Sequence, residues 1–291
     1  MIQWIVMDMD GTLLNSQDQI SERTRALLMQ CQKQGIKLIL ASGRSQYRLY
    51  PYAKMLDMKR YDGYFIEVNG MAYRRLRTNE RVLFQRLNHQ QIQAIFNELK
   101  KYEGEIQGYL DDTIYLSVSP YAFKQKQLER IRLNLADDFP WTGGAWGWLG
   151  DTRNGYPYIH WVYSASQLPY ELNKMTFMRE PEYVADIMPS LCAQFPDCEL
   201  VRPTPRAIEF SPKGVTKGSC LEKLMQEEQI GFDEVLVLGD GENDIDMFSK
   251  VKYSVAMGNA ASYVKERAYD VTLSHDEDGV AAAIMKYCLH D

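Results

Sequence analysis

The 291-residue sequence predicts an α/β fold, in which a doubly wound parallel sheet is interrupted by an inserted α+β domain. Short apolar runs alternate with helix-like segments over residues 2–70, and the same alternation returns after residue 213. Between these stretches, helices are followed by paired short strands, which is typical of an α+β unit. We therefore expect a core domain over 1–83 and 213–291 and an inserted domain over 84–212.

The composition limits the classes of function. A hydrophobic content of 45% and a charged content of 25% are those of an ordinary globular protein. The net charge of −6 argues against a nucleic-acid partner, and no apolar run approaches the roughly 20 residues needed to span a bilayer. The N-terminus lacks a signal-peptide layout, and the five cysteines form no C-x-x-C pair. We expect a cytoplasmic protein with neither a nucleic-acid nor a membrane partner.

The first half of the core is expected to alternate strand and helix. Ser21 is a suitable N-cap for the first helix, and Gly35 would end it. The second helix contains Pro51, which we expect to disturb it. The expected elements are strands over 2–7, 36–41 and 64–68, with helices between Ser21 and Gly35 and over 46–56. This order favours right-handed connections in a parallel sheet.

The rest of the chain divides into the inserted domain and the second half of the core. In the inserted domain we expect helices around 92–99, 123–135 and 184–191, and strands over 106–109, 113–118, 175–178, 199–202 and 207–210. In the core we expect helices over 217–229, 244–250 and 280–287, and strands over 234–238 and 253–256. The irregular stretch 141–163 is rich in Trp, Tyr and Gly. It could form an aromatic platform for a substrate or a subunit, but packing within the inserted domain is the interpretation we favour.

Polar residues follow the ends of the predicted core strands, where α/β sheets place their chemistry. They are Asp8, Asp10, Ser42, Asn69, Asp240, Asn243 and Asp244, with Lys217 at the start of a helix. Each has an ordinary explanation as a turn or helix-start residue. Together they predict a phosphate site. The carboxylates are suitable ligands for Mg²⁺, and a Ser-Gly turn can donate hydrogen bonds to phosphoryl oxygens. The lysine would balance the negative charge of the acids and of the phosphoryl group.

These residues resemble the four motifs of the haloacid dehalogenase superfamily. The motifs are Asp8-Met9-Asp10-Gly11-Thr12, Ser42-Gly43-Arg44, Lys217-Gly218 and Gly239-Asp240-Gly241-Glu242-Asn243-Asp244. The run from Leu238 through Ala260, together with Asn69-Gly70 and 214–218, is similar to the signature of the Cof-type hydrolases. The resemblance implies a Rossmann-like core, and it places an α/β cap domain between the second and third motifs.

The resemblance also implies roles for individual residues. Asp8 would attack phosphorus, and Asp10 would act as general acid and base. Mg²⁺ would be held by Asp8, the backbone carbonyl of Asp10 and Asp240. The phosphoryl group would be bound by the backbone amide of Met9 and by Ser42, Gly43, Lys217 and Asn243. The supporting residues would be Thr12, holding Asp10 in position, Asp244, orienting Lys217 or a metal-bound water, and Arg44 and Asn69.

The function expected from this resemblance is a Mg²⁺-dependent phosphatase that hydrolyses small phosphorylated metabolites, sugar phosphates above all, through an aspartyl phosphate. A phosphomutase of the same superfamily would use the same residues. A phosphoryl-receiver domain also clusters acids, a Ser or Thr and a Lys, but it has no use for a large insertion. A non-catalytic sensing protein is disfavoured because every catalytic position is filled.

Overall fold

Strand β1 (Trp4–Met7) lies inside an eight-stranded sheet of the computed structural model, which describes residues 1–144 and 146–289. The strand order among these residues is β14-β13-β12-β1-β2-β3-β4-β5. The strands from β14 to β3 pair in parallel, and β4 and β5 are antiparallel. The other bounds are β2 (Lys37–Ala41), β3 (Tyr64–Glu67), β4 (Ala72–Arg75), β5 (Arg81–Leu83), β12 (Val235–Gly239), β13 (Tyr253–Ala256) and β14 (Asp270–Val271). The predicted parallel sheet is confirmed, whereas the β4–β5 hairpin was not expected.

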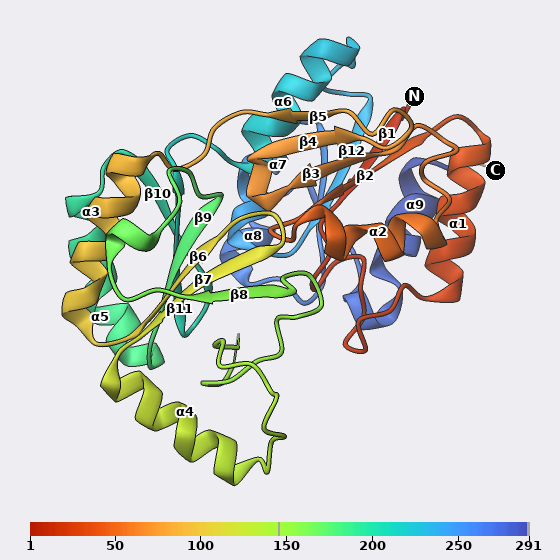
Figure 1. The fold of residues 1–291 in the computed structure, drawn as a ribbon. Coiled ribbons are helices and arrows are strands. Elements are labelled where there is room, and N and C mark those ends of the chain that lie inside the picture. The colour runs from red at the N-terminus through yellow and green to blue at the C-terminus, as the bar shows by residue number, and fades with distance from the viewer. Residues whose placement is uncertain (145, 290–291) are drawn as a thin grey trace. The chain divides into compact units, whose positions relative to one another are not determined.

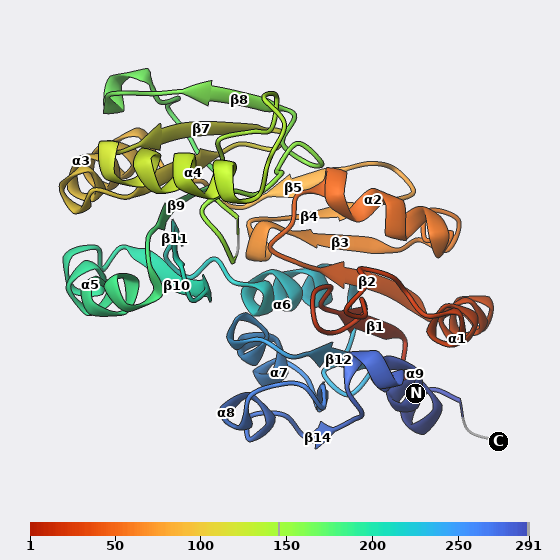
Figure 2. The same ribbon diagram turned by 90° about the horizontal axis from the view of Figure 1, so that it is seen from below.

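Helices cover both faces of this sheet, as the doubly wound pattern requires (Figures 1 and 2). Alternate residues of β1 point to opposite faces: Ile5 joins one hydrophobic cluster and Trp4 the other. The helices on the Ile5 face are α1 (Glu22–Lys33), α2 (Gln46–Met55) and α9 (Gly279–Tyr287). Those on the Trp4 face are α6 (Lys217–Glu228), α7 (Ile245–Ser249) and α8 (Ser262–Lys265). Because every residue of β1 is buried, its run of apolar side chains is explained by burial on both faces.

The chain divides into two compact units, Met1–Phe84 with Val215–Asp291, and Gln85–Gly214. The last residues of the predicted core domain, 290–291, lie outside the described residues, as does residue 145 of the aromatic stretch. Helix α2 continues through Pro51 to Met55, so the predicted helix is present and the proline does not end it. Leu49 and Ala53, on either side of the proline, are buried, and this packing outweighs one missing N–H donor.

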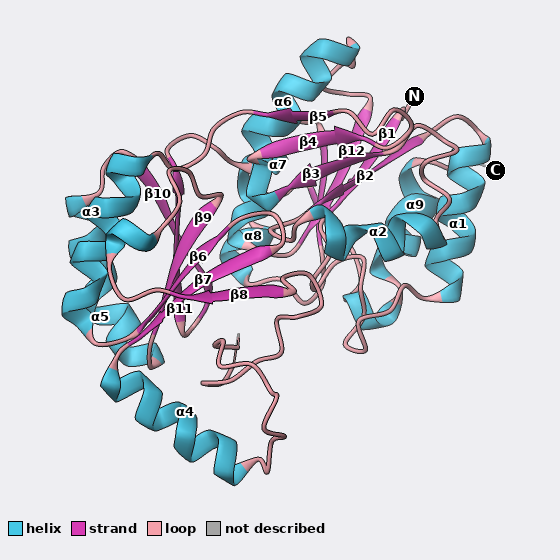
Figure 3. Cartoon of the chain, viewed as in Figure 1, coloured by secondary structure: helices cyan, strands magenta, loops and turns pink. Residues whose placement is uncertain are grey.

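The second unit is built on a six-stranded, mainly antiparallel sheet, whose strands are magenta in Figure 3. The order among the described residues is β10-β11-β9-β6-β7-β8. The strands are β6 (Glu105–Tyr109), β7 (Thr113–Val118), β8 (Tyr158–Trp161), β9 (Lys174–Met178), β10 (Cys198–Thr204) and β11 (Ala207–Pro212). The helices are α3 (His89–Leu99), α4 (Pro120–Arg132) and α5 (Pro181–Gln194). Phe96 of α3, Leu191 of α5 and Phe177 of β9 share one hydrophobic cluster, so α3 and α5 pack on the sheet.

The aromatic stretch 141–163 of this unit is partly packed and partly exposed. Trp141 stacks on Phe123 of α4 at 4.7 Å between ring centroids. Tyr156 is buried and contacts Tyr109. Trp146 is 80% exposed, and Tyr163 is also exposed. The stretch also contains β8, which was not predicted because its Tyr-Ile-His-Trp sequence lacks alternation.

Candidate active site

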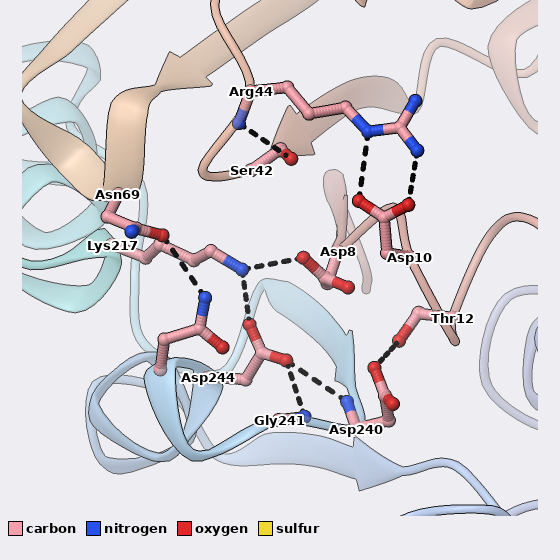
Figure 4. Close-up of polar contacts among 11 residues, drawn as sticks. Asp8, Asp10, Thr12, Ser42, Arg44, Asn69, Lys217, Asp240, Gly241 and Asp244 are labelled. Carbon is pink, nitrogen blue, oxygen red and sulfur yellow. Dashed lines mark hydrogen bonds and ion pairs between the residues drawn. The ribbon is translucent and has the colours of Figure 1, made fainter. Parts of the chain in front are cut away.

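The site is assembled where the parallel core strands end (Figure 4). Asp8 follows β1, Ser42 follows β2 and Asp240 follows β12. Because these strands are parallel neighbours in register, their carboxyl ends lie at one edge of the sheet. Lys217 is the first residue of α6, whose N-cap is Thr216.

A buried lysine joins two of the predicted site carboxylates. The Lys217 Nζ donates to Asp8 Oδ1 at 2.6 Å and to Asp244 Oδ1 at 2.7 Å. Burial alone would lower the pKa of Lys217, but Asp244 and Asp8 outweigh burial, so its pKa lies above the usual value. Lys217 is therefore held as an ammonium group, and it fixes the direction of the Asp8 carboxylate.

Three carboxylates crowd around this single ammonium. One oxygen each of Asp8, Asp240 and Asp244 lies within 4.8 Å of the others. Burial raises the pKa of Asp8 well above its usual value, with Lys217 opposing and the other two acids adding to the shift. Burial, followed by the charge of Asp244, raises the pKa of Asp240 to about 6. The cluster has excess negative charge, which a cation would relieve.

The oxygen ligands present suit a hard divalent cation such as Mg²⁺. Asp244 is already committed elsewhere, because its Oδ1 accepts from Lys217 and its Oδ2 accepts from the backbone N–H groups of Asp240 and Gly241. Among the described residues, Asp8 accepts one hydrogen bond from Lys217, and Asp240 accepts two, from Thr12 and Asn259. These two carboxylates therefore keep more lone pairs for a cation than Asp244, which accepts three bonds. This arrangement supports an orienting role for Asp244 rather than direct coordination.

Asp10 lies at the exposed rim of the site, and its side chain is 60% exposed. Its two oxygens accept from the Nε and Nη2 of Arg44, at 2.9 Å for the Nε bond. Arg44 is 9% exposed and also lies over the ring of Tyr52. A planar guanidinium bonded to both oxygens fixes the plane of the carboxylate. Arg44, predicted only as a supporting residue, is the group that orients Asp10.

The turn that follows β3 contacts three of the predicted phosphate-binding segments. Asn69 has φ 53° and Gly70 has φ 93°, in the left-handed region. The Asn69 N–H donates to the carbonyl of Ser42 at 3.0 Å, and its Oδ1 accepts from Asn243 Nδ2 at 3.1 Å. A Cβ on Gly70 would lie 1.9 Å from the carbonyl oxygen of Thr216. The turn therefore needs asparagine and glycine, which tolerate positive φ, and it sets the spacing of the segments that contain Ser42, Asn243 and Lys217.

The remaining residues predicted to bind phosphate are Met9, Ser42 and Gly43, at the same edge of the sheet. The side chain of Met9 is buried in the core, so its backbone is the part that can reach a ligand. Ser42 is 2% exposed, and its Oγ accepts from the N–H of Arg44 at 3.1 Å. A Cβ on Gly43 would lie 3.2 Å from Asn69 Oδ1, so this position favours glycine.

Two contacts of Asp240 differ from the sequence prediction or were missed by it. Thr12 was expected to hold Asp10, but its hydroxyl donates to Asp240 Oδ1 at 3.0 Å. The reason is that Asp10 turns outward to Arg44, while the loop that carries Thr12 passes beside β12. Asn259, which follows β13, donates to Asp240 Oδ2 at 3.3 Å. Its place after a parallel core strand was the signal that could have identified it.

Comparison with known proteins gives one family over nearly the whole chain. Residues 5–284 match the sequence profile of the haloacid dehalogenase-like hydrolases. A Bacillus subtilis phosphatase, YwpJ, is 26% identical, with 98% of this chain and 99% of that protein covered. A solved structure described as a sugar phosphatase of HAD subclass IIB is similar with a TM-score of 0.74, at 24% identity and 98% coverage of both chains. A chloroplastic endoribonuclease of Arabidopsis thaliana is 26% identical over 98% of this chain, which spans only 46% of that longer protein.

Proposed function

Because the chain belongs to the haloacid dehalogenase-like hydrolases and is a phosphatase of their Cof-type group, we propose that it hydrolyses phosphate monoesters of small metabolites, with sugar phosphates as the favoured substrates. The proposal includes Mg²⁺ dependence, an aspartyl phosphate on Asp8 and a cytoplasmic location. The observation that carries it is the Asp8 carboxylate, buried at the end of β1, bonded to Lys217 and beside Asp240. All five cysteines are free thiols, which supports the location.

In the proposed reaction, an oxygen of Asp8 attacks phosphorus and the bond to the leaving alkoxide breaks. Asp10 gives a proton to that alkoxide and then takes one from the water that hydrolyses the acyl phosphate. For this role Asp10 leaves Arg44 and enters the first step as a carboxylic acid, with its proton taken from solvent. The carboxylate formed in that step is then the base that accepts the proton of the attacking water. Lys217 and the groups around Ser42 and Asn243 bind the phosphoryl oxygens and keep phosphorus in line with Asp8.

A divalent cation would be held by Asp8 and Asp240, with the backbone carbonyl of Asp10 as the further protein ligand. When bound, Mg²⁺ supplies positive charge to the phosphoryl oxygens. The inserted domain, residues 84–212, is assigned the recognition of the leaving group. This assignment rests on the core motifs, which bind only the phosphoryl part of the substrate.

The proposal is tested by measuring phosphate release from p-nitrophenyl phosphate and from a panel of sugar phosphates. The expected result is phosphate release from both, with selectivity among the sugar phosphates. Isomerised sugar phosphate without phosphate release would instead identify a phosphomutase. No turnover of any ester would contradict the proposed reaction.

Metal removal is expected to abolish turnover. An excess of chelator should remove activity, Mg²⁺ should restore it and Ca²⁺ should inhibit, because Ca²⁺ accepts more ligands at longer distances and would coordinate Asp8 in a geometry unsuited to attack. The measurement is the rate of phosphate release after dialysis and after each addition. Full activity in excess chelator would contradict the carboxylate metal site.

Replacing Asn69 by Gly should weaken phosphate binding without straining the turn. Glycine keeps the positive φ and removes the bond to Asn243, and a neutral hydrogen bond is worth about 0.5–1.5 kcal/mol. We expect the inhibition constant of inorganic phosphate to rise by about two- to tenfold. Asn69→Ala is the matched variant, since it loses the same bond and adds strain, so it should also lower the melting temperature. An unchanged inhibition constant in Asn69→Gly would show that the turn does not position Asn243.

A further inference from the structure

We propose that Asn259 is a positioning residue for the metal site, because it ties the Asp240 carboxylate to the loop after β1. The proposal rests on the proposed function, in which Asp240 is a ligand of the divalent cation. It concerns a side chain that the motif comparison leaves without a role. All the groups involved lie in the unit formed by Met1–Phe84 and Val215–Asp291.

The side chain of Asn259 makes three hydrogen bonds, each to a different segment. Its Nδ2 donates to the carbonyl oxygen of Gly11 at 2.9 Å and to Asp240 Oδ2 at 3.3 Å. Its Oδ1 accepts from the backbone N–H of His275 at 3.0 Å. Only one of the two amide orientations satisfies these contacts, because the reverse one would set a carbonyl oxygen against two acceptors. Asn259 therefore acts as a donor toward Asp240.

Each oxygen of Asp240 accepts a hydrogen bond from a different residue. Thr12 donates to Oδ1 at 3.0 Å, and Asn259 donates to Oδ2. A carboxylate with one donor on each oxygen has a fixed plane, and its remaining lone pairs have a fixed direction. Partners that orient a metal ligand in this way affect metal affinity although they do not touch the ion.

The loop after β1 approaches the Asp240 carboxylate closely at Gly11. Gly11 has φ 80°, and a Cβ at this position would lie 2.3 Å from Asp240 Oδ2. The loop therefore approaches the carboxylate as closely as glycine permits, and the amide of Asn259 bonds both. The Nδ1 of His275 lies 3.0 Å from the carbonyl oxygen of Leu14, so the segment that orients Asn259 is itself attached to the same loop.

The position of this loop matters because it carries three groups of the proposed site. Asp8, the backbone carbonyl of Asp10 and Thr12 all belong to it or adjoin it. Asn259 thus links the cation ligands that follow β1 with the ligand that follows β12. Loss of the link should loosen the relative placement of these ligands, while the sheet on which they stand stays intact.

The test is direct binding of Mn²⁺ by electron paramagnetic resonance and of Mg²⁺ by calorimetry, on the full chain and without substrate. Asn259→Ala and Asn259→Ser should raise the dissociation constant by about tenfold or more, since the loss of such partners costs about 10–100-fold. Asn79→Gly is the control, because Asn79 is also exposed, has φ 61° and bonds Tyr50 and Arg74 in the same unit. It should leave the dissociation constant unchanged.

Thr12→Val is an independent test of how Asp240 is oriented. It removes the hydrogen-bond donor to the other oxygen of Asp240 and keeps the shape of the side chain. The double variant Thr12→Val/Asn259→Ser should bind Mn²⁺ more weakly than either single variant. Dissociation constants within twofold of the parent in both folded Asn259 variants would overturn the proposal, even if their melting temperatures fell. Failure of the parent protein to bind either ion would instead contradict the metal site of the proposed function.

Discussion

Asp8→Asn is expected to lower kcat by a factor on the order of 10⁴ or more, which is the scale of losing a catalytic nucleophile. An amide oxygen is a poor nucleophile, and the asparagine side chain has almost the same size as aspartate. The fold should survive, because the Asn carbonyl can still accept from Lys217 at the position of Asp8 Oδ1. Burial raises the pKa of Asp8, which means that the folded site disfavours a negative charge at this position. The neutral asparagine removes that charge from the cluster of acids. The melting temperature should therefore equal or exceed that of the parent.

The measurements are initial rates of phosphate release and thermal unfolding on the same sample, with mass spectrometry to exclude deamidation back to Asp. Asp57→Asn is the matched control, because Asp57 is exposed, has φ 50° and tolerates asparagine. It should keep the parent rate. Near-normal turnover in Asp8→Asn, with deamidation excluded, would contradict covalent catalysis by Asp8.

The parallel core could be predicted because burial on both faces leaves a clear sequence pattern. β1, β2 and β12 are short apolar runs that end at polar residues, and this is enough to place Asp8, Ser42 and Asp240 at one edge. The β4–β5 hairpin was missed because Ala72–Arg75 carries two arginines, of which Arg74 is buried in ion pairing with Glu67. A buried strand stabilised by an ion pair does not show the apolar signal.

The placement of side chains within the site was less predictable. Motif order indicated that Thr12 lies near the acids, but whether it bonds Asp10 or Asp240 depends on the path of the loop around Gly11. The bond from Asn259 to Asp240 joins residues 19 apart, and the bond to Gly11 joins residues 248 apart. Such contacts depend on how the loops fold over the sheet edge. Strand periodicity carries no information on this.

Lys217→Met is expected to destabilise the protein strongly in the absence of metal. Lys217 is fully buried and donates to two carboxylates, and its removal leaves Asp8, Asp240 and Asp244 within 4.8 Å of one another. Breaking a buried ion pair by removing one partner costs about 3–5 kcal/mol. For a domain of this size that corresponds to a melting temperature lower by about 6–20 °C. Turnover should also be lost, because the phosphoryl group loses its buried cation.

The electrostatic origin of this effect can be separated from packing by adding Mg²⁺. A divalent cation held by Asp8 and Asp240 would compensate part of the missing ammonium charge, so Mg²⁺ should raise the melting temperature of Lys217→Met more than that of the parent. Lys223→Met, on the exposed side of the same helix α6, is the control and should respond to Mg²⁺ like the parent. If Lys217→Met were destabilised but gained no more from Mg²⁺ than the parent, packing of the lysine stem would explain its stability loss. The three carboxylates would then not have the excess negative charge proposed here, because the lysine and the metal are both expected to neutralise that charge.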